Sequence, residues 1–187
     1  MKTDFTLTSN DALTVLTKAK GISTWRDLTS YVKHLPYGRN SNRTDLSLIL
    51  KEQKGTCSSK HALLKEIAHL NAIPNVKLVL GIYRMNASNT PKIGDVLTEN
   101  NLEFIPEAHC YLKIGDKRLD FTSSNSDFRR IKNDVLIEHE IEPQQVADFK
   151  VEYHKRFIKN WITEEHIRFS FDDIWTLREQ CIANLSA

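Results

Sequence analysis

The stretch Lys54-Gly55-Thr56-Cys57-Ser58-Ser59-Lys60-His61-Ala62-Leu63-Leu64 predicts a break in the chain followed by the start of a new helix. Its first three residues break the preceding helix, and residues 58–70 are rich in Ala, Leu, Lys and Glu, which favour a new helix. At 100° per residue, one side of that helix carries Cys57, His61, Leu64 and Ala68. We therefore expect Cys57 at the start of a helix, on its half-buried face.

Three helices are predicted before this stretch. The first has Ser9 as its N-cap and Gly21 at its C-terminal end, and its apolar side comprises Ala12, Leu13, Val15, Leu16 and Ala19. The second has apolar residues at spacings of three and four from residue 25 to residue 35 and ends at Pro36. A short third helix is expected over residues 45–53, with its inward side formed by Leu46, Ile49 and Leu50.

After the central helix the sequence changes to the period of a strand. Residues 76–83 form a β-branched and apolar run, which predicts a strand, and the polar residues 84–101 predict a long loop. A further strand begins at residues 135–137 and ends before Pro143. The long helix that follows is predicted to turn inward Val146, Phe149, Tyr153, Phe157 and Trp161. The last helix begins with a capping box of Ser170 and Asp173, and its inward stripe comprises Ile174, Leu177, Cys181, Ile182 and Leu185.

A β-hairpin is predicted around Gly115-Asp116, a favourable two-residue turn between the alternating segments 109–113 and 117–122. In this register Tyr111 lies opposite Asp120. His109 and Asp120 then become diagonal neighbours on one face, with Cβ atoms roughly 7 Å apart. The hairpin therefore predicts a His–Asp pair.

The composition is that of a soluble globular chain. Of 187 residues, 40% are hydrophobic and 27% are charged, so one domain with a sizeable core is expected. The net charge of +2 and the interrupted basic clusters argue against a nucleic-acid partner. No signal-like or membrane-spanning apolar run is found, so we expect a cytoplasmic protein with no membrane partner. Three cysteines without paired spacing predict free thiols.

Cys57, His109 and Asp120 have the combined chemistry of a nucleophilic acyl-transfer site. A thiol attacks a carbonyl only as the thiolate, and a helix N-terminus favours that anion. His109 would take the thiol proton and return it to the leaving group, while Asp120 orients the ring. The N–H of Cys57 would donate to the oxyanion, and Tyr37 or Trp25 would supply a second donor.

Several segments, in their order along the chain, resemble the transglutaminase-like superfamily. Residues 54–64 resemble its nucleophile motif: a glycine, one residue, the cysteine and an Ala/Leu-rich helix. The strand ending in Leu80-Gly81-Ile82-Tyr83 resembles its next strand. Glu107-Ala108-His109-Cys110-Tyr111 resembles its His-x-aromatic strand, and Arg118-Leu119-Asp120-Phe121-Thr122 resembles its Leu-Asp-x-Thr segment. The sequence departs from the family at Tyr111, where Trp is common, and in the short interval between the histidine and the aspartate.

The resemblance implies an α+β fold with a papain-like core, in which the helix carrying Cys57 packs on an antiparallel sheet carrying His109 and Asp120. We expect a single transglutaminase-like domain over residues 1–187. Its core would span about residues 30–125, and a C-terminal helical addition would span about residues 143–187.

The implied activity is acyl transfer to, or hydrolysis of, an amide, peptide or ester bond through a thioester on Cys57. The substrate would be a peptide, a protein or a small amide, and neither a cofactor nor a metal is expected. Hydrolysis needs only water as the acceptor, so a peptidase or amidase is favoured over a transglutaminase. The sequence leaves the oligomeric state open.

Other interpretations of these residues remain. Cys57 could be a small buried hydrophobic residue, which is the usual state of a free cysteine. The fold could also serve as a transglutaminase-like binding module without turnover. A metal site that joins Cys57 and His61 to His69 or to Glu138-His139-Glu140 would lack the paired close spacings of structural zinc ligands. Cys110, which points away from His109, and Cys181, which lies on a helix stripe, are expected to be structural.

Overall fold

The computed structural model describes residues 4–185 and has an α+β fold. Its centre is a four-stranded antiparallel sheet in the order β3-β2-β1-β4. The strands are β1 (Val76–Met85), β2 (Ile105–Ile114), β3 (Lys117–Leu119) and β4 (Val135–Ile141). Within the described residues the helices are α1 (Ala12–Ala19), α2 (Trp25–His34), α3 (Ser47–Lys51), α4 (Cys57–Leu70), α5 (Val96–Glu99), α6 (Asp148–Glu164) and α7 (Phe171–Asn184). Two 3₁₀ turns, η1 (Phe128–Arg130) and η2 (Pro143–Val146), lie on either side of β4.

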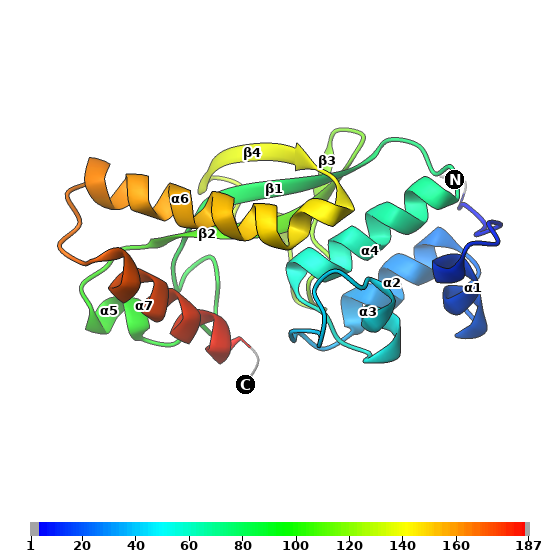
Figure 1. The fold of residues 1–187 in the computed structure, drawn as a ribbon, viewed down its shortest axis with the longest axis horizontal. Helices are drawn as coiled ribbons and strands as arrows, with labels where there is room; N and C mark the ends of the chain where they lie inside the picture. The colour runs from blue at the N-terminus through cyan, green and yellow to red at the C-terminus, as the bar shows by residue number, and fades with distance from the viewer. Residues whose placement is uncertain (1–3, 186–187) are drawn as a thin grey trace.

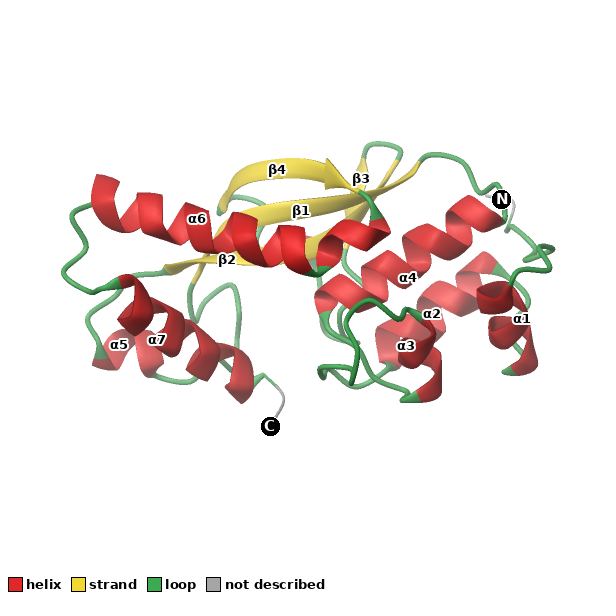
Figure 2. Ribbon diagram, in the orientation of Figure 1, coloured by secondary structure: helices red, strands yellow, loops and turns green. Residues whose placement is uncertain are grey.

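The helices form two groups joined by one long helix. Helices α1 to α4 gather at one end of the molecule and α5 and α7 at the other, while α6 runs across between them (Figure 1). In the view of Figure 2 the strands lie along the upper side, with most of the helices below them. One hydrophobic core joins α4 and its neighbours to the sheet, and a second fills the space among the sheet, α5, α6 and α7. No helix of the described chain is long and apolar enough to cross a membrane.

Helix α4 has the predicted bounds but not the predicted exposure. It runs from Cys57 to Leu70, and every residue from Cys57 to Leu64 is buried. The helix contacts α1, α2 and α3 on one side and β1, β2 and η2 on others, so it has no solvent-facing stripe over its first two turns. The expectation of a half-buried face was therefore wrong: α4 is a central helix.

Strand β1 is confirmed and is longer than predicted. It pairs with β2 on one side and β4 on the other, and nearly all of its residues are buried on both faces. The predicted loop of residues 84–101 is correspondingly shorter, because β1 continues to Met85 and α5 occupies Val96–Glu99.

The predicted hairpin is confirmed in its paired part. Strand β2 ends at Ile114, β3 begins at Lys117, and Gly115 takes the positive φ of 58° that a tight turn favours. The observed pairs, such as Leu112 with Leu119, belong to the predicted register. Strand β3 ends at Leu119, so Asp120 lies just beyond the paired segment.

Helix α1 differs from its prediction at the cap and on its buried side. Asp11, not Ser9, is the N-cap, because its carboxylate accepts the N–H groups of Leu13 and Thr14, both at 2.9 Å. The predicted Val15 is 50% exposed, and the buried residues of α1 are Thr14 and Thr17. The hydroxyl of Thr14 accepts from the side chain of Asn71, and the hydroxyl of Thr17 donates to the carbonyl of Leu13.

The predicted stripe of α6 was also wrong in part. Phe149 is 43% exposed, Val146 belongs to η2, and the buried residues of α6 are His154, Ile158 and Trp161. Helix α6 packs against both cores, so its buried surface is not a single stripe. The capping box of α7 at Ser170 and Asp173 is confirmed, and Ile174, Cys181 and Ile182 are buried. Helix α3 covers only residues 47–51 of the predicted 45–53, with Ile49 and Leu50 buried.

Candidate active site

Cys57 is the first residue of α4. Thr56 and Ser59 form a capping box: the N–H of Thr56 donates to Ser59 Oγ at 2.9 Å, and the N–H of Ser59 donates to Thr56 Oγ1 at 3.4 Å. This box leaves the N–H groups of Cys57 and Ser58 as the uncapped donors of the first turn. The thiol is sheltered from solvent, since Cys57 is only 7% exposed.

His109 and Asp120 are brought together by the hairpin of β2 and β3. His109 Nε2 lies 2.9 Å from Asp120 Oδ2, within hydrogen-bonding distance. The other carboxylate oxygen, Asp120 Oδ1, accepts the N–H of Thr122 at 2.9 Å. The carboxylate is therefore held from two sides, and it fixes the orientation of the imidazole.

His61 ties the start of α4 to the segment that follows Asp120. Its Nε2 accepts the N–H of Phe121 at 2.8 Å, so the ring proton is on Nδ1, which donates to the carbonyl of Cys57 at 2.7 Å. Burial lowers the pKa of His61 to about 4, which keeps the ring neutral. Both nitrogens of His61 are thus occupied by backbone groups. Within residues 4–185 no three His, Cys, Asp or Glu side chains are arranged to hold a metal ion.

A lysine from the C-terminal half of the chain reaches the thiol. Lys150, in the first turn of α6, has its Nζ 3.9 Å from Cys57 Sγ and donates to Ser58 Oγ at 2.7 Å. Ser58 Oγ itself lies 3.8 Å from the sulfur. The thiol therefore has an ammonium group beside it, in addition to the uncapped N–H groups of the helix start.

The electrostatics of the site favour a thiolate and an imidazolium. Burial opposes ionisation of Cys57, but Lys150 and His109 outweigh it, so the pKa of the thiol is lowered. Burial likewise disfavours a charged His109, yet Asp120 and Cys57 outweigh it and raise the pKa of the imidazole. For Asp120, the histidines overcome burial and lower the pKa of the carboxyl. The three groups thus stabilise one another's charged forms.

Two cavities meet at Cys57. The larger, of about 580 Å³, is lined by His109, Asp120 and the Ser123–Ser126 segment. The smaller, of about 300 Å³, is lined by Lys150, Trp175 and several arginines. Of the two predicted oxyanion donors, Tyr37 borders both cavities beside Cys57, whereas Trp25 lines neither and packs against the core of α4.

Glu107 and Arg178 form a buried ion pair next to the site, which the sequence analysis missed. Arg178 of α7 donates to both carboxylate oxygens of Glu107 on β2, at 2.6 and 2.7 Å. Arg178 and His154 overcome the effect of burial and lower the pKa of Glu107 to about 2. A signal for Glu107 exists in the sequence, because it lies two residues before His109 and so shares its face of the strand.

Lys150 had no such local signal, because it contacts a residue 93 positions away along the chain. The remaining cysteines do not join the trio. Cys110 and Cys181 are buried, and burial raises the pKa of both thiols, to about 12 and about 11.

Comparisons with protein-family models, with curated proteins and with solved structures give no match for this chain.

Proposed function

We propose that this protein is a cysteine-dependent acyl-transfer enzyme that hydrolyses or transfers the acyl group of an amide, peptide or ester through a thioester on Cys57. The observation that carries the proposal is the arrangement of Cys57, His109 and Asp120 around one cavity, with the imidazole fixed by the 2.9 Å contact to the carboxylate. The proposal includes a transglutaminase-like, papain-like core, for which the packing of α4 on the antiparallel sheet is the support.

In the proposed reaction the thiolate of Cys57 attacks the carbonyl carbon, and the carbonyl oxygen becomes an oxyanion. The N–H of Cys57 donates to that oxyanion, and Tyr37 or Lys150 supplies a second donor. His109 protonates the leaving group as the tetrahedral intermediate collapses to the thioester. It then removes a proton from the incoming water or amine, and the thiolate departs from the second intermediate.

The pH dependence of alkylation tests the proposal. Iodoacetamide should label Cys57 well below the pH at which an ordinary thiol, of pKa about 8.5, becomes reactive. His109→Ala removes one of the two cations beside the sulfur, so labelling at pH 6 should slow by roughly tenfold for each unit by which the thiol pKa rises. The site of labelling is read by peptide mass.

The control is His69→Ala, at an exposed histidine of the same helix as Cys57, which should leave the labelling rate unchanged. Labelling that follows the titration of an ordinary thiol, and that His109→Ala leaves unaffected, would refute the enzymatic function and favour the binding module instead.

A further inference from the structure

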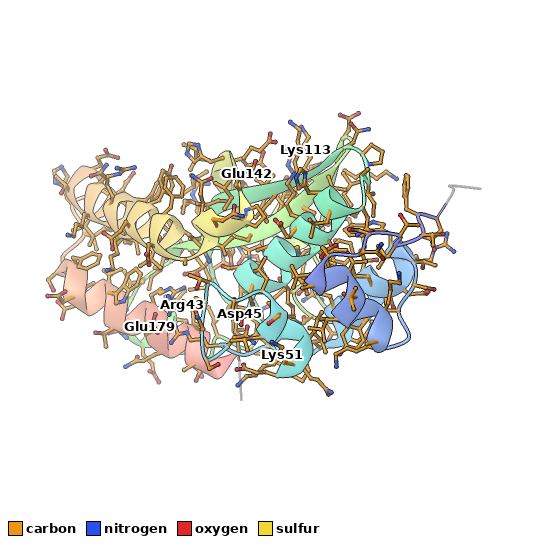
Figure 3. The ribbon with its side chains drawn as sticks, turned by 45° about the vertical axis from the view of Figure 1, so that its right-hand side comes forward. Arg43, Asp45, Lys51, Lys113, Glu142 and Glu179 are labelled. Carbon is orange, nitrogen blue, oxygen red and sulfur yellow. The ribbon has the colours of Figure 1, made fainter. Side chains whose placement is uncertain are left out.

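The smaller cavity beside Cys57 is rich in positive charge. Its lining includes two carboxylates, Glu107 and Glu179, but five cationic side chains, which are Arg39, Arg43, Lys150, Lys155 and Arg178. We call it the cationic cavity. Figure 3 labels two of these residues, Arg43 on the loop before α3 and Glu179 on α7, and both line the cavity.

Two of the five cations are neutralised within the cavity wall. Arg178 is paired with Glu107, and Arg39 donates to Glu179 at 2.7 Å. Lys150 faces the sulfur of Cys57 and the hydroxyl of Ser58. Both carboxylates of the lining are therefore already paired with arginines, and the lysine nearest the thiol is already in contact with Cys57 and Ser58.

Arg43 and Lys155 are left without a full counter-charge. Arg43 is exposed and forms no ion pair with any residue of the described chain. Lys155 contacts Glu152 at 3.2 Å, but both side chains are at least 36% exposed, and such a pair contributes little. The lining of the cavity therefore carries more positive than negative charge, and a cleft of one sign concentrates ligands of the other.

The position of His109 decides which part of a substrate would occupy the cationic cavity. His109 lines only the larger cavity, and the leaving group must lie beside the imidazole that protonates it. The leaving group therefore belongs in the larger cavity. The acyl part, which stays on the sulfur, belongs in the cationic cavity.

We propose that the acyl donor carries an anionic group, a carboxylate or a phosphate, which binds Arg43 and Lys155 while the reacting carbonyl lies at Cys57. This inference rests on the proposed function. A volume of about 300 Å³ is at the small end for a ligand site, so the acyl part has the size of one amino acid rather than of a protein segment.

Two alkylating probes that differ only in charge test the inference. Chloroacetylglycine ends in a carboxylate and chloroacetylglycinamide in a neutral amide, and both react with Cys57 by displacement of chloride by the thiolate. The anionic probe should react several-fold faster than the neutral one at low ionic strength, and this preference should fall as salt screens the cavity.

The double variant Arg43→Gln/Lys155→Gln should lower the ratio of the anionic to the neutral rate several-fold. Its control, Lys51→Gln/Lys159→Gln, removes the same charge at two exposed lysines outside the cavity and should keep the wild-type ratio. Should the double variant fold poorly, the salt dependence of the wild-type ratio tests the same point without a substitution.

The outcomes separate the two proposals. If both probes react as slowly as with an ordinary thiol, the proposed function fails. If the neutral probe reacts quickly but the anionic probe has no advantage, or an advantage that the double variant keeps, the enzymatic function stands and the anionic subsite is overturned. Protection of Cys57 by N-acetylglycine indicates a carboxylate and protection by inorganic phosphate indicates a phosphate, whereas protection by neither counts against the subsite.

Discussion

His61 shows how one buried side chain can hold the candidate site together without lining either cavity. Its neutral ring connects the carbonyl of Cys57 to the N–H of Phe121, and so holds the start of α4 against the residue that follows Asp120. His61 is fully buried, so both of these backbone groups would lose their partner if the ring were removed. We infer that the distance between the thiol and the carboxylate depends on this histidine.

The low pKa of His61 predicts a loss of stability in mild acid. The unfolded chain binds a proton at this residue near pH 6.5, whereas the folded protein binds it only near pH 4. The free energy of unfolding should therefore fall as the pH drops from 6.5 to 4, with about 3 kcal/mol from this residue. His61→Gln cannot titrate, so its urea midpoint should fall less over this range.

His69→Gln is the control for this measurement, because His69 lies on the same helix but is exposed. It should keep the acid sensitivity of the wild-type protein. Identical pH profiles for His61→Gln and the wild type would contradict the assignment of a neutral, buried His61.

Side chains near one another in sequence were predictable, and those that come from distant helices were not. The His109–Asp120 contact follows from a two-residue turn and the period of a strand, both of which are local. Lys150 and Arg178 reach the site only through the packing of α6 and α7, 93 and 71 positions from their partners. Neither helix carries a motif that distinguishes these residues from ordinary surface cations.

Strand β1 depends on a glycine at its centre. A Cβ on Gly81 would lie 2.8 Å from the hydroxyl oxygen and 2.9 Å from Cε1 of Tyr111. Tyr111 cannot move freely, because it is fully buried and its hydroxyl donates to Glu138. Gly81 pairs with His109, and the ring of Tyr111 leans over it from the diagonal position, so β2 can carry Tyr111 in this orientation only because β1 has no side chain at residue 81.

Gly81→Ala should lower the free energy of unfolding by about 1–3 kcal/mol, the usual cost of overpacking a core. The free energy of unfolding is measured by urea titration, and its dependence on urea concentration is compared with that of the wild type. Gly38→Ala is the matched control, since its new Cβ would meet only the flexible side chain of Lys54, at 3.2 Å from Cδ. Equal losses of unfolding free energy in Gly81→Ala and Gly38→Ala would show that the close approach of Tyr111 to β1 does not affect stability.

The bounds of the helices were easier to predict than the side that each helix buries. The bounds of α4 and α7 followed from breakers and caps, which are local signals. The buried sides of α1 and α6 did not follow, because hydrogen-bonded threonine hydroxyls in α1 and two separate cores around α6 changed which residues face inward. The spacing of apolar residues along the sequence indicates neither the hydrogen-bonded threonines of α1 nor the two cores around α6.

The C-terminal helix is attached to the sheet by the buried Glu107–Arg178 pair. The side chains of Glu107 and Arg178 are 6% and 11% exposed, and without Glu107 the buried guanidinium of Arg178 keeps only its contact with Glu179. Glu107→Gln should therefore lower the free energy of unfolding at pH 7 by about 3–5 kcal/mol. Glu140→Gln, which breaks the exposed pair with Lys77, should cost less than about 1 kcal/mol.

The same pair predicts the response to stronger acid. The pKa of Glu107 is about 2 in the folded protein and near 4.5 when it is unperturbed, so its contribution is complete above pH 4.5 and is lost as the pH falls towards 2. Between pH 7 and pH 3 the urea midpoint should drop more for the wild type than for Glu107→Gln. An equal difference in both proteins would contradict the assignment of the low pKa to this pair.

The order of the site residues along the chain has a consequence for biosynthesis. Cys57, His109 and Asp120 are all translated before Lys150, and Lys150 before Arg178. A ribosome-bound chain can form the hairpin and α4 before the cation from α6 exists, because folding proceeds from the N-terminus during synthesis. The thiol of such a nascent chain lacks one of the two cations that lower its pKa. Under the proposed function, the thiol of Cys57 therefore reaches its full reactivity only after α6 has been made and has docked.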